Sequence, residues 1–237
     1  MEGFSYHNIF DTKGIEYLVV IAFLLLLIPF WMALNKKPAI REKFRRAFGI
    51  LSASVLSIPQ GIFYNKNHTW AYLEKSGSAR IGLDDFLLRI TGYVTIRQLK
   101  DTGQMIRKGE AIAEIEQNGK SLHILSPISG KIIRFNSALN ANHGLPNEDP
   151  YGRGWIYDIK PTDWMGEIPS FYLAEGAISW LKKEMKHYKD FLAINISKYQ
   201  PEPTQVVLQD GGEISENSLS DLPPETWQLF QSEFLNP

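Results

Sequence analysis

Side chains able to perform nucleophilic, acid–base or metal chemistry are few in this sequence. Cysteine is absent, which excludes disulfides, a thiol nucleophile, iron–sulfur ligands and attachment of c-type haem. The five histidines lack the spacing of metal ligands, and neither a glycine-rich phosphate loop nor a Gly-x-Ser-x-Gly motif occurs. We therefore predict no catalytic residue and no metal site, and an enzyme is the weakest interpretation.

Two groups of residues could still support proton transfer. A carboxylate pair drawn from Glu116, Glu148 and Asp149 could act in acid–base catalysis if the two pKa values were separated. His68 and Trp70 form the second group. A histidine and an aromatic residue at alternate strand positions more often belong to a core and its polar edge, and Asp before Pro is typical of a turn. We therefore favour structural roles for these residues.

Lys120 is the lysine whose position is most informative, because it follows the dipeptide Asn118-Gly119. Residues 112–115 and 122–125 alternate apolar and polar side chains on either side of that dipeptide. Asn-Gly tolerates the positive φ angles of a two-residue type I′ turn, so the pattern predicts a β-hairpin with its tip at Asn118-Gly119. The simplest interpretation of Lys120 is a solvated charge beside that turn.

The hairpin and the turn after it, Ser-Pro-Ile-Ser-Gly at 126–130, resemble the lipoyl-bearing hairpin of lipoyl domains. They are most similar to the H protein of the glycine cleavage system, whose motif runs Glu-Ser-Val-Lys-Ala-Ala, four further residues, then Pro-Val-Ser-Gly. Other stretches match the same family: His-Thr-Trp at 68–70, residues 79–86, Arg-Lys-Gly-Glu at 107–110, Asn-Ser-Ala-Leu at 136–139 and, most specifically, residues 147–155.

This resemblance implies a fold and locates a carrier position. The implied fold is mainly β with added helices, the lipoyl-type barrel-sandwich hybrid of two antiparallel sheets. Counting from Glu116 or from Ser126 places Gly119 where the family carries its lipoyl lysine, and Lys120 stands one residue later. Successive side chains of a strand point to opposite faces, so the shifted lysine leaves the hairpin in another direction. We therefore expect no cofactor, with lipoate on Lys120 as the alternative.

A polar N-terminal stub, residues 1–14, precedes a predicted transmembrane helix, residues 15–35. Residues 18–34 carry no charge over 17 positions, close to the roughly 20 residues that cross a bilayer core. Most of these are Leu, Ile, Val or Phe, so we expect insertion to be favourable by about 5 kcal/mol. A cleaved signal peptide and a buried soluble helix are the alternatives. The first is disfavoured because the stub is not basic and no small-residue cleavage site follows.

The next segment, residues 36–60, is basic and juxtamembrane in this interpretation. Six Lys and Arg residues lie between positions 36 and 46, against the single Lys13 just before the span. The positive-inside rule then predicts a single-pass protein of the cell (inner) membrane, with its C-terminal domain in the cytoplasm. Residues 41–56 are expected either to lie on anionic headgroups as an amphipathic segment or to pack on the domain as a helix.

The H-protein-like domain is predicted to span residues 61–165. Its pattern is one of short strands separated by glycine turns, interrupted by a helical stretch at residues 84–90. A C-terminal helix, residues 166–195, is expected to pack on this domain through apolar residues at helical spacing.

The last segment, residues 196–237, is predicted to be a flexible tail that ends in a short amphipathic helix. Trp227, Phe230 and Phe234 share one face of that helix. This face either docks to a protein partner or folds back on the chain's own domain, and the sequence leaves both alternatives open.

The length and net charge of the chain limit the classes of function that are possible. With 237 residues and a net charge of −1, the chain can form one domain with appendages and is not a nucleic-acid binder by charge. The leading interpretation is a membrane-anchored, non-catalytic interaction or structural subunit of a membrane-associated complex, lacking the carrier lysine in register. The alternative is a working lipoyl carrier that uses Lys120 to move aminomethyl groups, acyl groups or electrons.

Overall fold

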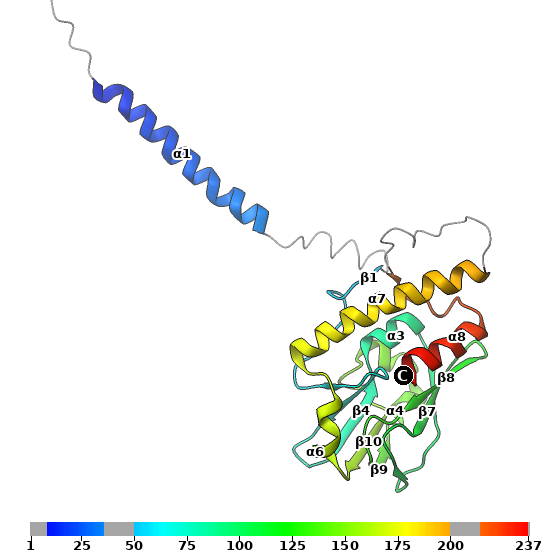
Figure 1. Ribbon diagram of the computed structural model, residues 1–237. Coiled ribbons are helices and arrows are strands. Elements are labelled where there is room, and N and C mark those ends of the chain that lie inside the picture. The colour runs from blue at the N-terminus through cyan, green and yellow to red at the C-terminus, as the bar shows by residue number, and fades with distance from the viewer. Residues whose placement is uncertain (1–8, 36–49, 200–213, 237) are drawn as a thin grey trace, which may run out of the picture. The chain divides into compact units, whose positions relative to one another are not determined.

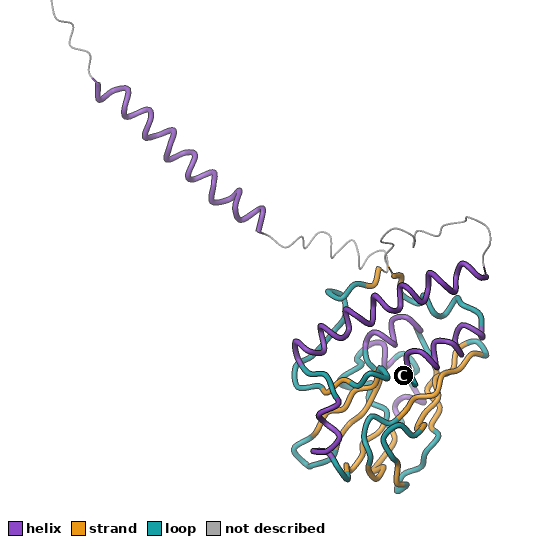
Figure 2. Tube along the Cα trace, in the orientation of Figure 1, coloured by secondary structure: helices purple, strands orange, loops and turns teal. Residues whose placement is uncertain are grey.

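The computed structural model describes residues 9–35, 50–199 and 214–236, and Figures 1 and 2 trace the chain. The chain divides into two compact units, Met1–Phe44 and Arg45–Pro237. The first contains one helix, α1 (Ile9–Asn35), whose side chains are described for residues 16–31 and are all exposed there. Among the residues that the structure describes, no helix combines the length and the apolar character needed to cross a membrane.

The second unit combines short strands with helices of very different length. Its strands are β1 (Ile50–Leu51), β2 (Phe63–Tyr64), β3 (Thr69–Leu73), β4 (Ala79–Leu83), β5 (Thr95–Gln98), β6 (Met105–Ile106), β7 (Ala111–Gln117), β8 (Lys120–Leu125), β9 (Gly130–Phe135), β10 (Tyr157–Pro161) and β11 (Ile214–Ser215). Its helices are α3 (Asp85–Thr91), α4 (Ala138–Ala141), α5 (Leu145–Glu148), α6 (Trp164–Glu167), the 3-10 helix η1 (Ile168–Ser170), α7 (Ala174–Tyr199), α8 (Pro224–Phe230) and the π-helical turn η2 (Gln231–Leu235).

Two antiparallel sheets form the β part of this unit. One has six strands in the order β2-β3-β4-β10-β9-β6, and the other has three in the order β5-β7-β8. A separate two-stranded pair joins β1 to β11, with Leu51 opposite Ile214. The expectation of antiparallel sheets with added helices is therefore confirmed. The β1–β11 pair ties the start of the unit to its C-terminal end.

The core lies between the strands and helix α7, with α3 between them (Figure 1). Phe86 of α3 packs edge-on against Tyr188 of α7, with ring centroids 5.6 Å apart. Trp70 of β3 is fully buried, and its indole N–H donates to the carbonyl oxygen of Leu83 over 2.8 Å. Burying a ring of this size while satisfying its one donor is strongly stabilising, so the core interpretation of Trp70 is confirmed.

Helical and hairpin signals in the sequence correspond to observed elements. The Asn118-Gly119 hairpin is β7 and β8, and the helical stretch at residues 84–90 is α3. Asp84 caps α3, because its side chain accepts a hydrogen bond from the backbone N–H of Leu87. The long C-terminal helix begins at Ala174 and continues to Tyr199, four residues beyond the expected end at 195.

Two expectations at the edges of the unit need correction. Residues 36–49 and 200–213 lie outside the described residues. Ile50 and Leu51 form a strand because their backbone groups pair with β11, so a helix over residues 41–56 is wrong from position 50 onward. We call residues 214–236 the C-terminal segment; they form β11, α8 and η2 and join the core. The predicted flexible tail is therefore wrong from residue 214 to the start of α8, whereas the short helix predicted at its end is confirmed as α8.

Gly130 begins β9 at a point of close backbone approach. A β-carbon there would lie 2.4 Å from the carbonyl oxygen of Lys160, so we expect Gly130→Ala to lower the free energy of unfolding by about 1–3 kcal/mol. Gly176→Ala is the matched control, since nothing lies within 4 Å of a β-carbon at that helical position. The control should be neutral or slightly stabilising. Urea unfolding followed by circular dichroism measures both, and equal losses would contradict the prediction.

Candidate functional site

The tip of the β7–β8 hairpin is the first candidate site. Asn118 and Gly119 have φ angles of 50° and 76°, as a type I′ turn requires, and both are exposed. A β-carbon at Gly119 would meet nothing within 4 Å, so the space above the tip is open and only the backbone conformation favours glycine. The tip therefore presents backbone and one amide side chain, without an amine.

Lys120 is the first residue of β8 and is half-buried. Its ammonium donates to the carbonyl oxygens of Ser220 and Leu222, the second at 3.1 Å. The same ammonium lies 5.1 Å from the centroid of the Trp227 ring, within the range of a cation–π interaction. Lys120 is thus bound by the C-terminal segment, and the prediction of a freely solvated charge is corrected for this reason.

The C-terminal segment also covers the edge of β8, which is an outer strand of its sheet. The side-chain oxygen of Gln231 accepts from the N–H of His123 over 2.7 Å, and its side-chain nitrogen donates to the carbonyl of His123 over 3.1 Å. One glutamine side chain therefore satisfies a donor and an acceptor that a neighbouring strand would otherwise pair. An edge covered in this way is protected from pairing with another chain.

The three aromatic residues considered for docking to a partner lie in the core instead. Trp227, Phe230 and Phe234 are at most 1% exposed. The Phe230 and Phe234 rings stack with centroids 4.6 Å apart, and both meet Tyr188 of α7 edge-on at 5.9 Å. In this conformation the helix face is folded back on its own domain, so these side chains offer no surface to a partner.

Two glutamates line a hollow beside the hairpin. Its volume is about 560 Å³, and it is bounded by Tyr93, Thr95, Glu114, Glu116, Gln117, Asn118, Gly119, Lys120 and Ser121. Arg97 pairs with both glutamates, reaching Glu116 over 2.8 Å and Glu114 through its other nitrogen. Both carboxylates form ion pairs with the same guanidinium, which suits a structural role better than proton transfer.

The other carboxylates considered for acid–base chemistry bind a different arginine. Glu148 and Asp149 lie 3.8 Å and 3.5 Å from the guanidinium of Arg153. Asp149 also accepts backbone N–H groups from Gly152 and Arg153, as expected for a turn. Glu148 and Asp149 therefore share Arg153, whereas Glu116 pairs with Arg97, so the structure does not join the three carboxylates in one catalytic arrangement.

His68 is fully buried, and the sequence did not reveal the carboxylates that surround it. Its Nδ1 lies 2.9 Å from Asp84 Oδ2, and its Nε2 lies 3.7 Å from Glu184 Oε1. Burial by itself lowers the pKa of His68, but these two carboxylates outweigh it and raise the pKa to about 9. Phe86 and Trp180 flank the ring at centroid distances of 5.0 and 5.3 Å. A buried imidazolium between two carboxylates is a structural ion pair.

Further polar contacts connect Glu184 of α7 to the C-terminal segment. Glu184 lies 3.6 Å from Nδ1 of His187, whose Nε2 is 2.6 Å from Glu233 Oε1. Among the described residues, no group of His, Asp and Glu has the arrangement of a metal site. Asp84 could have been anticipated as a helix cap before an apolar run. No local signal could have paired His68 with Glu184 or His187 with Glu233.

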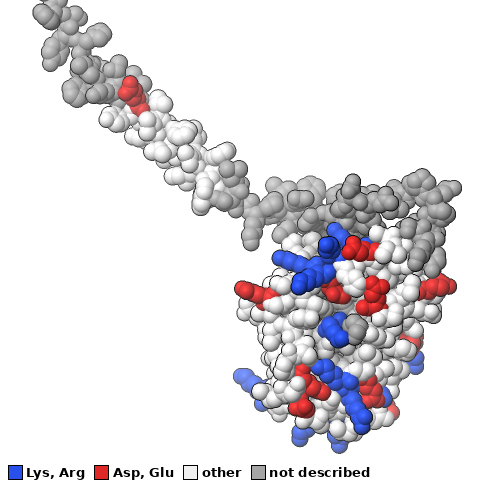
Figure 3. All heavy atoms as spheres, in the orientation of Figure 1, with Lys and Arg blue, Asp and Glu red and all other residues white. Residues whose placement is uncertain are grey.

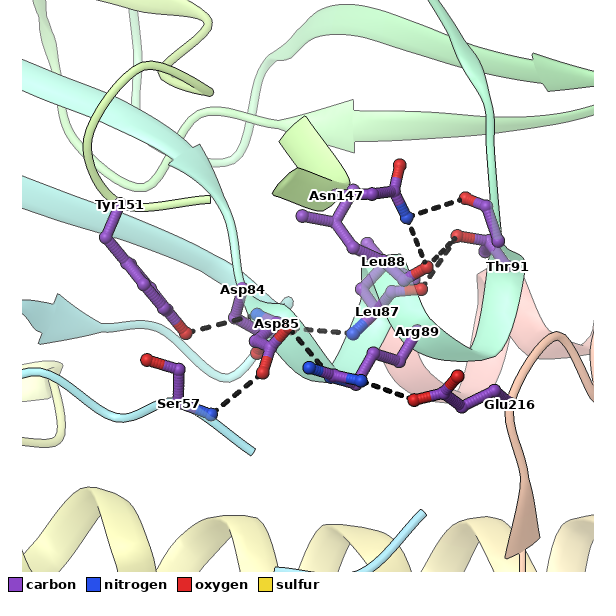
Figure 4. A network of polar contacts seen from close by, with 11 residues as sticks. Ser57, Asp84, Asp85, Leu87, Leu88, Arg89, Thr91, Asn147, Tyr151 and Glu216 are labelled. Carbon is purple, nitrogen blue, oxygen red and sulfur yellow. Dashed lines mark hydrogen bonds and ion pairs between the residues drawn. The ribbon is translucent and has the colours of Figure 1, made fainter. Parts of the chain in front are cut away.

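A second polar network surrounds α3 (Figure 4). The carboxylate of Asp85 accepts from the N–H of Ser57 over 2.8 Å and from Arg89 over 3.0 Å, and Arg89 also pairs with Glu216. The amide of Asn147 donates to the carbonyl oxygens of Leu88 and Gly92, at 3.0 and 3.1 Å. Residues of the 79–86 and 147–155 motifs therefore meet at this helix, where their visible role is to join chain segments.

In comparisons with known proteins, residues 62–184 match the family model described as Glycine cleavage H-protein. The chain is 36% identical over 129 residues to a glycine cleavage system H protein of Thermus thermophilus, covering 54% of this chain and 99% of that one. It is 31% identical over 125 residues to a probable glycine cleavage system H protein of Pyrococcus abyssi, covering 53% and 92%. A crystal structure of a glycine cleavage system H protein from Mycobacterium marinum aligns with a TM-score of 0.45 and 25% identity, over 52% of this chain and 96% of that chain.

Proposed function

Because this chain belongs to the glycine cleavage H-protein family, we propose that it is a member whose lipoyl-carrier-like domain no longer carries lipoate. It acts instead as a non-catalytic interaction or structural subunit of a membrane-associated complex. One observation carries this proposal: the amine nearest the hairpin tip, Lys120, is bound by the chain's own C-terminal segment.

A carrier arm needs an amine that is exposed on a long, mobile stem. Lys120 instead makes contacts with two carbonyl oxygens and an aromatic ring. Acylation of this amine would remove its positive charge, and with it the attraction to the Trp227 ring and to both carbonyl oxygens. Gly119, which occupies the family's carrier position when the motif is counted from Glu116, has no side chain to modify.

Membrane anchoring by residues 15–35 is the second part of the proposal. Its support is the uncharged run at residues 18–34 and the six basic residues between positions 36 and 46. This support comes from the sequence, since no helix among the described residues meets the length and apolar character of a span. The positive-inside rule supports a cytoplasmic location for the H-protein-like domain.

The alternative is a carrier that uses Lys120 after the turn and the C-terminal segment rearrange. It is favoured by one observation, the position of this lysine directly after the hairpin tip. Carrying aminomethyl groups, acyl groups or electrons would then require release of Lys120 from Ser220 and Leu222.

Peptide mass spectrometry tests the proposal directly. We expect the full-length protein, purified in detergent from a lipoylating host, to carry no lipoate on the peptide that contains Lys120. The double variant Gly119→Lys, Lys120→Ala should acquire lipoate, because position 119 faces open space at an exposed turn. A lysine at this positive φ costs about 1 kcal/mol, which the fold should tolerate.

The single variant Lys120→Ala is the control, and it should remain unmodified. Circular dichroism should show the same folded spectrum for both variants and for the native chain. Lipoate on Lys120 of the native protein would overturn the proposal in favour of the carrier alternative. Partner subunits that co-purify with native protein in detergent would support the structural role.

A further inference from the structure

A basic face on helix α7 suggests how the folded unit is held against the membrane surface. Lys182, Lys186 and Lys189 are spaced by four and three residues, so they lie on one side of the helix. Among the described residues, none of the three forms an ion pair. Figure 3 shows basic side chains on the side of the unit along which α7 runs, with some acidic side chains among them.

The same face contains a hollow with an apolar floor. Its volume is about 280 Å³, and it is lined by Leu51, Ser52, Ala53, Lys182, Met185, Lys186 and Lys189. Leu51 and Met185 are buried beneath it, whereas Lys182 and Lys186 are exposed at its rim. Ile178, one turn before Lys182 on the same helical side, is 39% exposed. Exposed lysines around apolar side chains are typical of surfaces that lie on phospholipid headgroups.

The hollow lies where the chain enters the folded unit, because Leu51 belongs to β1. From Asn35, the end of α1, to Ile50 there are fifteen peptide units, which span at most about 50 Å when fully extended. If α1 is inserted in a bilayer, the folded unit therefore stays within reach of that bilayer's surface. This tether raises the effective concentration of headgroups at the face without any added contact.

We propose that Lys182, Lys186 and Lys189, with the hollow between them and β1, form a docking surface for anionic phospholipid headgroups of the membrane that anchors the chain. This inference rests on the proposed membrane anchoring. The occupant is argued from charge complementarity, because three ammonium groups that form no ion pair with a described residue attract phosphates. The neighbouring chain segment 36–49 is itself strongly basic and would be repelled. Two acidic residues of α7 lie at helical spacing from these lysines, Glu175 seven residues before Lys182 and Asp190 four residues after Lys186.

The acidic segment 200–213 is the competing occupant within the chain. It contains Glu202, Asp210 and Glu213 and no basic residue. This occupant would protect the lysines in any environment, whereas lipid docking protects them only when anionic lipid is present. Segment 200–213 and anionic lipid therefore give different results in one experiment.

The experiment uses the full chain in phosphatidylcholine vesicles, with and without phosphatidylglycerol. Surface amines are acetylated briefly, and peptide mass spectrometry measures the rate at each lysine. We expect phosphatidylglycerol to slow acetylation of Lys182, Lys186 and Lys189 by about fivefold, with the effect falling as salt is added. Lys131 is an exposed residue of β9, a strand that lies away from α7 in Figure 1, and it should react equally in both vesicles.

Flotation of the same samples after a high-salt wash reports on anchoring separately. Protein that floats but shows equal lysine reactivity in both vesicles overturns the docking surface and leaves the anchor intact. If the protein does not float, membrane anchoring is contradicted. If phosphatidylglycerol vesicles also protect none of the three lysines from acetylation, the docking surface is overturned as well. Protection in phosphatidylcholine alone that disappears in a Glu202→Gln, Asp210→Asn, Glu213→Gln variant overturns the proposal in favour of segment 200–213.

Discussion

Replacing Trp227 by alanine is expected to lower the free energy of unfolding by about 3–5 kcal/mol. The ring is 1% exposed, and its indole N–H donates to the carbonyl oxygen of Leu219 over 2.8 Å. The substitution leaves a large cavity, removes a satisfied buried donor and takes away the ring beneath the Lys120 ammonium. The effect should be this large because the C-terminal segment is part of the core and not an appendage.

Leu229→Ala provides the matched control on the same helix. Leu229 is 43% exposed, so its truncation should change stability by less than about 0.5 kcal/mol. Urea unfolding should be followed by far-ultraviolet circular dichroism, because removing a tryptophan changes the fluorescence signal. A Trp227→Ala protein as stable as the Leu229→Ala protein would show that the C-terminal segment does not contribute to the core in solution.

The elements that the sequence predicted well are those specified by neighbouring residues. Asn118-Gly119 defines a hairpin because both residues tolerate positive φ, and the observed angles agree. Residues 84–90 form a helix because Asp84 caps it and the following residues are apolar with helical spacing. In each case the physical cause lies within a few residues, so no knowledge of the tertiary structure is needed.

Contacts between distant segments explain what the sequence could not predict. Lys120 is 100 residues from Ser220 and His123 is 108 from Gln231, yet these pairs decide whether the hairpin is free or covered. Trp227, Phe230 and Phe234 were correctly placed on one helix face, but periodicity cannot distinguish a partner's surface from the chain's own. The folded-back state follows from the apolar partners that Tyr188 and Phe191 of α7 provide.

The covered hairpin and the altered turn are two aspects of one proposed loss. A carrier hairpin must stay accessible to the enzymes that modify and unload it, so a segment bound along its edge would hinder that role. Because the tip has no amine at the family's carrier position, covering the β8 edge no longer hinders a carrier role. The cover also protects exposed backbone groups of that edge. Gln231 and the Trp227 ring provide this cover through contacts with His123 and Lys120.

The stability of the protein should fall as pH rises from about 6 to above 9, because His68 is held as a buried imidazolium. Its pKa is about 9 in the folded state against an ordinary value of 6.5. A raised folded-state pKa contributes stability that is complete below the unfolded-state pKa and is lost as the pH passes the folded-state value. The difference corresponds to roughly 3 kcal/mol, lost mainly between about pH 6.5 and pH 9.

His68→Gln should remove this dependence, since glutamine does not titrate. At about pH 6 the variant should be less stable than the native protein by about 3–5 kcal/mol, because Asp84 is left buried without its charged partner. Above about pH 9 the difference between the two should narrow, as native His68 loses its proton. His187→Gln is the control, since His187 is 44% exposed and should leave most of the slope in place. Urea unfolding across this pH range measures both slopes, and an undiminished decline in His68→Gln would assign the pH dependence to other groups.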